Sequence, residues 1–288
     1  MKKWQGNLML TAAAVIWGCA FTAQSSAMDH VGPWTFVCVR SLLASAALYA
    51  LRPFLSAGRR KTPAADRRAG ILLGVILLAA CAFQQFGVLY SSAGKAGFLT
   101  ALYIIIVPLL SVALKEKIPL QIWPAVLLAA VGLYFLSFRG KPTLERGDFF
   151  LLCCALMYAL YIIAIDRTAS EADSVHVSCI QFLVTGLLAV IPMLTEQPQA
   201  SSLLGAWKEI LYAGICSSAG GYTLQIIGQK YTDPSSAGML MSLESVFALL
   251  AGVIILHETV SFQEAAGCVL IFAAILLSQM NFAKRKSS

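Results

Sequence analysis

Ten long apolar stretches limit what this chain can fold into more than any other feature of its sequence. A helix needs roughly 20 residues to cross the hydrocarbon core of a membrane, and each stretch is close to that length. We therefore predict an all-α, polytopic membrane protein with ten transmembrane helices. Their expected ranges are 6–27, 34–55, 70–90, 94–114, 119–138, 148–166, 174–194, 207–229, 234–256 and 261–282.

The composition supports a membrane protein and argues against several other classes. Of the 288 residues, 59% are hydrophobic and only 12% are charged, whereas a soluble domain carries about 25% charged residues. So little charge argues against a cytosolic enzyme, a disordered chain and a nucleic-acid binder. The first apolar run continues to about Ala27, which is longer than the core of a signal peptide, so we interpret it as a spanning helix.

The distribution of Lys and Arg predicts which side of the membrane each loop faces. If the N-terminus is cytoplasmic, fifteen of these residues fall inside and five outside, and Arg40 is left within a helix. The inside set is Lys2, Lys3, Arg52, Arg59, Arg60, Lys61, Arg67, Arg68, Lys115, Lys117, Arg167, Lys230, Lys284, Arg285 and Lys286. The outside set is Lys95, Arg139, Lys141, Arg146 and Lys208. Cytoplasmic loops are enriched in Lys and Arg, so we predict a multi-pass protein of the bacterial inner membrane with both termini in the cytoplasm.

The second half of the chain repeats the first half at an offset of 141 residues. The clearest matches are between polar residues and glycines, and they are Gln84 with Gln225, Gly87 with Gly228, Tyr90 with Tyr231, and Ala96-Gly97 with Ala237-Gly238. Five helices per half is an odd number, so the second copy must enter the membrane inverted. We predict two inverted five-helix repeats, at residues 1–140 and 141–288. This arrangement is typical of secondary transporters, which bind substrate near the midplane.

Four short motifs are spread over nearly the whole chain. They are Ile16-Trp17-Gly18 with Phe21, Pro33 with Arg40, residues 96–103 leading to Val107-Pro108-Leu109-Leu110, and residues 242–248 with Glu258. In these motifs the chain resembles the EamA-type drug/metabolite transporters, which have ten helices. Relatives often carry proline where Ser245 stands, so we expect a less kinked ninth helix here. The resemblance implies a transporter of small metabolites, often an exporter, that is ion-coupled or facilitative.

Glu244 is the sharpest candidate for a functional residue. It lies ten residues after Pro234, which at 1.5 Å per residue places it roughly 15 Å into the membrane. An isolated charge at that depth costs at least about 2.5–3.5 kcal/mol, so Glu244 must be protonated, paired or facing a watery cavity. We interpret it as a proton-coupling or cation-binding group, and the alternative is a structural bond to a neighbouring carbonyl.

Arg40 is the second charged residue inside a predicted helix. It lies about 9 Å from the outer end of helix two, where it can snorkel to the interface, pair with Glu244 or contact a substrate carboxylate. Its counterpart in the second half, Gln181, is neutral. Two further acids, Glu116 and Glu258, recur at the ends of helices four and nine, where we expect cap or loop contacts.

Amide and aromatic side chains complete the expected site. Gln84 and Gln225 occupy matching positions, where an amide can donate and accept hydrogen bonds to a polar metabolite or join two helices. Trp17, Tyr103 and Tyr158 lie well inside their helices, where they can form the wall of a cavity for a small amphipathic solute or simply pack.

Together these features predict a secondary transporter that exports small metabolites such as amino acids by alternating access through a central cavity. The candidate substrate-binding residues are Glu244, Arg40, Gln84, Gln225, Trp17, Tyr103 and Tyr158. The expected partners are a small-molecule substrate, the lipid bilayer and, as a candidate, a coupling proton or cation. We expect no cofactor, metal or nucleic acid, and no P-loop for ATP is present. The alternatives are a membrane-embedded enzyme acting on lipid-linked substrates, and a channel.

Overall fold

The structure, a computed structural model, describes residues 2–55, 63–91, 93–137, 146–256 and 260–279, and this part of the chain contains helices and no strand. The first half forms α1 (Lys3–Ala27), α2 (Pro33–Leu55), α3 (Pro63–Leu89), α4 (Ala93–Ala101), α5 (Tyr103–Ala113) and α6 (Ile122–Ser137). The second half forms α7 (Arg146–Thr168), α8 (Ser174–Thr195), α9 (Ala200–Gly205), α10 (Trp207–Leu211), η1 (Tyr212–Tyr222), α11 (Thr223–Gln229), α12 (Pro234–Met241), α13 (Leu243–Leu256) and α14 (Phe262–Gln279).

The prediction of a ten-helix membrane protein is confirmed. Within the described residues, nine helical spans are long and apolar enough to cross a membrane, and a tenth apolar helix, Ile122–Phe135, is shorter. Three of the nine spans are built from consecutive labelled pieces. They are α4 with α5, α10 with η1 and α11, and α12 with α13.

The structure departs from the expected helices in several places, including the following three. Helix three begins at Pro63 rather than at residue 70, because proline is well suited to the first turn of a helix. A short helix, α9, was not expected in the connection after α8. The ninth helix is interrupted at Ser242, whose hydroxyl donates to the carbonyl of Met239 at 2.7 Å. Such bonds back to the preceding turn often bend helices. The expectation that Ser245 leaves this helix less kinked than in relatives stays a prediction.

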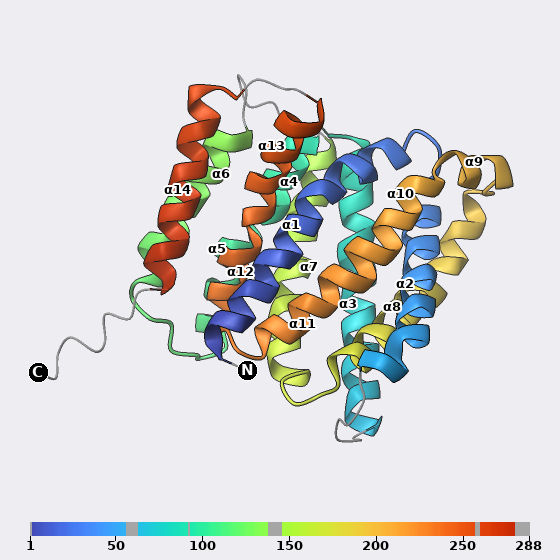
Figure 1. The fold of residues 1–288 in the computed structure, drawn as a ribbon, viewed down its shortest axis with the longest axis horizontal. Helices are drawn as coiled ribbons and strands as arrows, with labels where there is room; N and C mark the ends of the chain where they lie inside the picture. The colour runs from blue at the N-terminus through green and yellow to red at the C-terminus, as the bar shows by residue number, and fades with distance from the viewer. Residues whose placement is uncertain (1, 56–62, 92, 138–145, 257–259, 280–288) are drawn as a thin grey trace, which may run out of the picture.

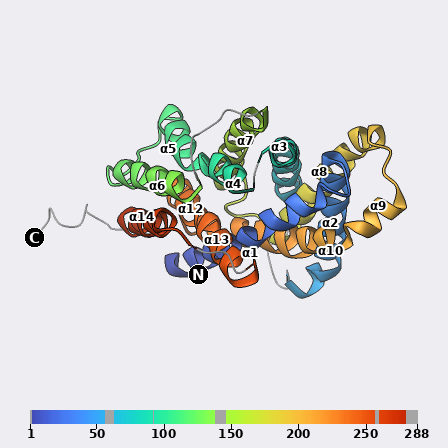
Figure 2. The same cartoon turned by 90° about the horizontal axis from the view of Figure 1, so that it is seen from above.

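The helices are arranged in two layers that are closed at both ends (Figures 1 and 2). Helix α1 and the segments α10–α11 and α12–α13 form one layer, while α3, α4–α5 and α7 form the other. The packed pair α2 and α8 closes one end of the molecule, and the packed pair α6 and α14 closes the opposite end. The first and second halves of the chain therefore interlock, and each layer contains helices from both.

Equivalent glycines make equivalent contacts in the two halves. A methyl group added at Gly6 would lie 2.8 Å from the carbonyl oxygen of Gly228, and one added at Gly147 would lie 2.8 Å from that of Gly87. At the 141-residue offset, Gly6 corresponds to Gly147 and Gly87 corresponds to Gly228. This regular packing supports the proposed inverted repeat, whose division at residue 140 stays a prediction.

Glu116 makes the kind of contact expected for a loop acid. Arg167 of α7 donates to its Oε1 at 2.8 Å, and this hydrogen bond holds the pKa of Glu116 below its usual value. The contact ties the connection after α5 to the end of α7. Its expected counterpart, Glu258, lies outside the described residues.

The glycine contacts generate a prediction about stability. We expect Gly6→Ala and Gly147→Ala each to lower the melting temperature of the detergent-purified protein, because the new methyl group meets backbone in both cases; overpacking of this kind costs about 1–3 kcal/mol. Gly97→Ala is the matched control, because a methyl group there meets no atom within 4 Å. Equal melting temperatures for all three variants would contradict the packing described here.

Candidate functional site

A cavity with an empty volume of about 480 Å³ lies among the buried residues of both layers. All seven residues singled out in the sequence line it. The complete lining is Trp17, Phe21, Gln24, Arg40, Gln84, Thr100, Tyr103, Tyr158, Ile162, Ser217, Tyr222, Gln225, Met241 and Glu244. The lining residues come from helices one, two, three, four, six, eight and nine in chain order.

Most of the lining consists of residues related by the 141-residue offset. The related pairs are Trp17 with Tyr158, Phe21 with Ile162, Gln84 with Gln225, Thr100 with Met241, and Tyr103 with Glu244. The other four lining residues, Gln24, Arg40, Ser217 and Tyr222, have counterparts that do not line the cavity. The cavity is therefore surrounded by matching positions of the two halves, but its chemistry is not the same on both sides.

Glu244 is placed by the break in the ninth helix. It is the second residue of α13 and only 5% exposed. The hydroxyl of Tyr103 donates to its Oε1 over 3.4 Å, a long hydrogen bond. Glu244 and Tyr103 are repeat counterparts, so this contact joins equivalent positions of the two halves across the cavity.

Arg40 does not snorkel to the interface and does not pair with Glu244. It is 2% exposed, and its guanidinium carbon lies 5.2 Å from the centre of the Phe36 ring. Its other close neighbours are Cys81, Tyr158 and Tyr222. In the part of the chain that the structure describes, no carboxylate lies within 4 Å of this guanidinium.

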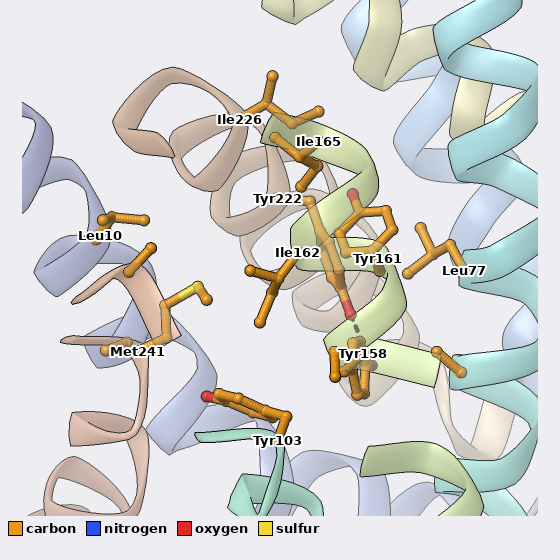
Figure 3. Packing of buried hydrophobic residues seen from close by; sticks show 14 of the residues in the cluster. Leu10, Leu77, Tyr103, Tyr158, Tyr161, Ile162, Ile165, Tyr222, Ile226 and Met241 are labelled. Carbon is orange, nitrogen blue, oxygen red and sulfur yellow. Dashed lines mark hydrogen bonds between the residues drawn. The ribbon is translucent and has the colours of Figure 1, made fainter. Parts of the chain in front are cut away.

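Tyr158 connects the polar groups beside Arg40. Its hydroxyl donates to Gln84 Oε1 at 3.1 Å and lies 2.8 Å from the hydroxyl of Tyr222. The Tyr222 ring stands edge-on to Trp17 with 4.9 Å between centroids. Figure 3 shows the Tyr158–Tyr222 pair together with Tyr103, and the side chains of Ile162 and Met241 lie in the same region. These residues come from α5, α7, η1 and α12, so the site depends on both halves.

Tyr222 and Ser217 belong to η1, an 11-residue π-helix. Short π-helical segments occur often at functional sites. The carbonyl of Ser217 in this segment accepts from Trp17 Nε1 at 3.2 Å. Gly221 provides the room for this contact, since a methyl group there would lie 2.6 Å from the same indole nitrogen. The tandem glycines Gly220-Gly221 thus sit where the helix departs from regular geometry.

Two amide pairs border the cavity. Gln225 Nε2 donates to Gln229 Oε1 at 2.9 Å, and Gln229 Nε2 donates to the carbonyl of Ile162 at 3.0 Å. Gln85 Nε2 donates to Gln24 Oε1. Sequence reasoning missed Gln24, because Gln84 and Gln225 were identified as matching positions of the two halves, whereas the counterpart of Gln24 is Ile165. Among the described residues, no group of three His, Cys, Asp or Glu is placed to hold a metal ion.

The chain belongs to the EamA-like transporter family. The family model matches it twice, at residues 4–138 and 145–280, and each match covers nearly one complete half. The class of protein inferred from the motifs is therefore confirmed.

Individual relatives agree with this assignment. The chain is 29% identical to an uncharacterized transporter of Archaeoglobus fulgidus over 96% of its own length and 86% of the relative. It is 28% identical to the threonine/homoserine exporter RhtA of Escherichia coli K12 over 67% of its length and 70% of that protein. A solved crystal structure with 21% identity has a TM-score of 0.78 and covers 98% of this chain and 99% of its own, which shows the shared fold.

The hydrogen bonds among Tyr158, Tyr222 and Gln84 predict different effects on stability for the loss of each tyrosine hydroxyl. We expect Tyr158→Phe to destabilise the purified protein more than Tyr222→Phe, because Tyr158 bonds both Gln84 and Tyr222 whereas Tyr222 bonds Tyr158. A buried polar group left without a partner costs about 1–3 kcal/mol. Thermal unfolding in detergent measures the difference, and a larger effect of Tyr222→Phe would contradict the assigned network.

Proposed function

We propose that this protein is a secondary transporter that exports small metabolites such as amino acids by alternating access. The observation that carries the proposal is the cavity, which is formed by matching positions of both halves and contains one carboxyl and one guanidinium group. A ligand in such a cavity touches both halves at once. A rocking movement of one half against the other would then open it to each side of the membrane in turn.

The lining supports a small polar solute as the cargo. Four amide and hydroxyl side chains from both layers, Gln24, Gln84, Gln225 and Thr100, offer donors and acceptors, while Trp17 and Phe21 supply apolar wall. A few placed polar groups in a mainly apolar wall are typical of small-molecule sites. Similarity to an exporter of threonine and homoserine supports amino acids as the first solutes to test.

Glu244 is proposed as the group that links transport to a proton or cation. A carboxyl in a buried cavity changes the charge of the site when it gains or loses a proton, and it can exchange that proton for a cationic group of the substrate. Tyr103 is its hydrogen-bond partner and is proposed to hold it in place. This role would make transport depend on pH through one residue.

The orientation proposed for the chain follows from its charges. Both termini face the cytoplasm of a bacterial cell, and the protein lies in the inner membrane. The ion pair between Arg167 and Glu116 then lies on the cytoplasmic side, and the connection containing α9 lies outside.

Glu244→Gln tests the coupling role. Protein in liposomes is loaded with unlabelled amino acid, and uptake of the same labelled amino acid is followed between pH 5.5 and 8.5. We expect saturable counterflow by the wild type, and a rate at least about tenfold lower that no longer varies with pH for Glu244→Gln, because an amide cannot exchange a proton.

Glu171→Gln changes an exposed acid away from the cavity and serves as the matched control, with wild-type behaviour expected. Wild-type rate and pH dependence in Glu244→Gln would remove Glu244 from the coupling step. Flux that rises without saturation for every amino acid tested would indicate a channel and contradict the transporter proposal.

The orientation has its own test. Arg60→Cys and Lys208→Cys are introduced separately into a cysteine-free background, and intact cells are treated with a membrane-impermeant maleimide. We expect the cysteine at position 208 to react in intact cells and the one at position 60 to react only after lysis. The reverse pattern would overturn the proposed topology.

A further inference from the structure

We propose that the cavity binds a zwitterion in one fixed orientation, with its carboxylate at Arg40 and its ammonium group at Glu244. This inference rests on the proposed transport function and specifies the charge pattern of the substrate. It excludes organic cations, diamines and dicarboxylates as preferred cargo.

The first observation is the uncompensated charge of Arg40. The guanidinium is almost completely buried and lies beside a thiol, two phenols and the Phe36 ring, none of which carries a negative charge in its ordinary state. Burying a cation is costly unless a counter-charge accompanies it. The planar guanidinium is well suited to bind a carboxylate through two parallel hydrogen bonds. A ligand carboxylate would supply the missing charge.

The second observation is the incomplete coordination of Glu244. Its partner in the structure is the Tyr103 hydroxyl at 3.4 Å, and a carboxylate can accept several hydrogen bonds. An ammonium group brings three donors and a positive charge. A ligand ammonium at this position would satisfy the carboxylate in a way that the neighbouring phenol does not.

The two charged groups line one cavity and have different hydrogen-bonding or ring partners. Arg40 lies beside Cys81, Tyr158 and Tyr222, whereas Glu244 contacts Tyr103. Both residues are near Cys154, but the two charges form no ion pair with one another. A ligand that satisfies both must carry opposite charges at two positions, as an amino acid does.

The comparison of the two halves explains why the orientation is fixed. The repeat counterpart of Glu244 is Tyr103, and that of Arg40 is Gln181, which does not line the cavity and instead accepts from Tyr161 at 2.8 Å. Both charges thus arise where the second half departs from the first. Most of the cavity wall is built from paired positions of the two halves, but its positive group and its negative group have no charged counterparts in the other half. A ligand with the same charge at both ends therefore does not match this charge pattern.

The test compares ligands that differ by one charge. The probes are the twenty common L-amino acids, screened by thermal shift in detergent. Those that bind are compared with two analogues of the same side chain, one lacking the carboxylate and one lacking the ammonium group. For L-leucine these are 3-methylbutylamine and 4-methylpentanoate. We expect each analogue to bind the wild type at least about tenfold more weakly, since a hydrogen bond to a charged group contributes this much.

Two variants provide a readout that a purely structural role would not change. In Arg40→Gln the amine should bind as well as the amino acid, and in Glu244→Gln the carboxylic acid should bind as well as the amino acid. Arg167→Gln, which alters a partly exposed guanidinium in the ion pair with Glu116, is the control and should keep the wild-type preference.

The outcomes separate this inference from the transport function. Saturable counterflow combined with equal binding of an amino acid and its analogues overturns the zwitterion inference and leaves the transporter proposal standing. Failure of every amino acid to bind, or tighter binding of a diamine or dicarboxylate, also overturns the inference. Absence of saturable counterflow for every solute is the failure of the proposed function itself.

Discussion

The cost of leaving a polar group without a partner inside a membrane governs this structure. Backbone groups avoid that cost by forming helices, and side chains avoid it by hydrogen bonding to one another or by facing a cavity. Tyr158 and Tyr222 satisfy each other, and the carbonyl of Ser217 finds the Trp17 indole. Arg40 and Glu244 are the charged residues of the cavity lining, and they are not satisfied in this way. We propose that a ligand in the cavity completes the interactions of these two groups.

Close helix packing gives these groups their positions. Gly6 and Gly147 bring α1 and α7 into contact with the backbone of the helices that end beside them, and Gly221 accommodates the indole of Trp17. Larger residues at these points would push neighbouring helices of the same layer apart. The polar network of the cavity thus depends on residues that have no polar side chain at all.

Much of the architecture could be predicted from the sequence because its signals are local. The length of each apolar run predicts a span, and counting from Pro234 placed Glu244 deep in the membrane. The seven candidate residues, which the structure brings around one cavity, stood out because polar and aromatic side chains are rare in such runs. Their binding role stays a proposal.

Other features depend on tertiary contacts and have no local signal. Leu102 interrupts the fourth helix, although neither glycine nor proline stands there. The π-helical geometry of η1 determines that Tyr222 faces the cavity, and the α-helical periodicity assumed from sequence does not describe that turn. The fate of Arg40 was equally undetermined, because snorkelling, pairing and cavity lining are all compatible with its depth.

Gly97 shows how the cavity of such a protein can change during evolution. It lies one turn before Thr100, a lining residue, and a methyl group at this position would meet open space. A methyl group added at its repeat counterpart Gly238 would lie 3.7 Å from the Tyr103 ring, which is an ordinary van der Waals contact. An added side chain would therefore meet a neighbouring ring at position 238 and open space at position 97. Duplication followed by such divergence gives a family a site at which the size of the accepted solute can drift while the scaffold keeps its stability.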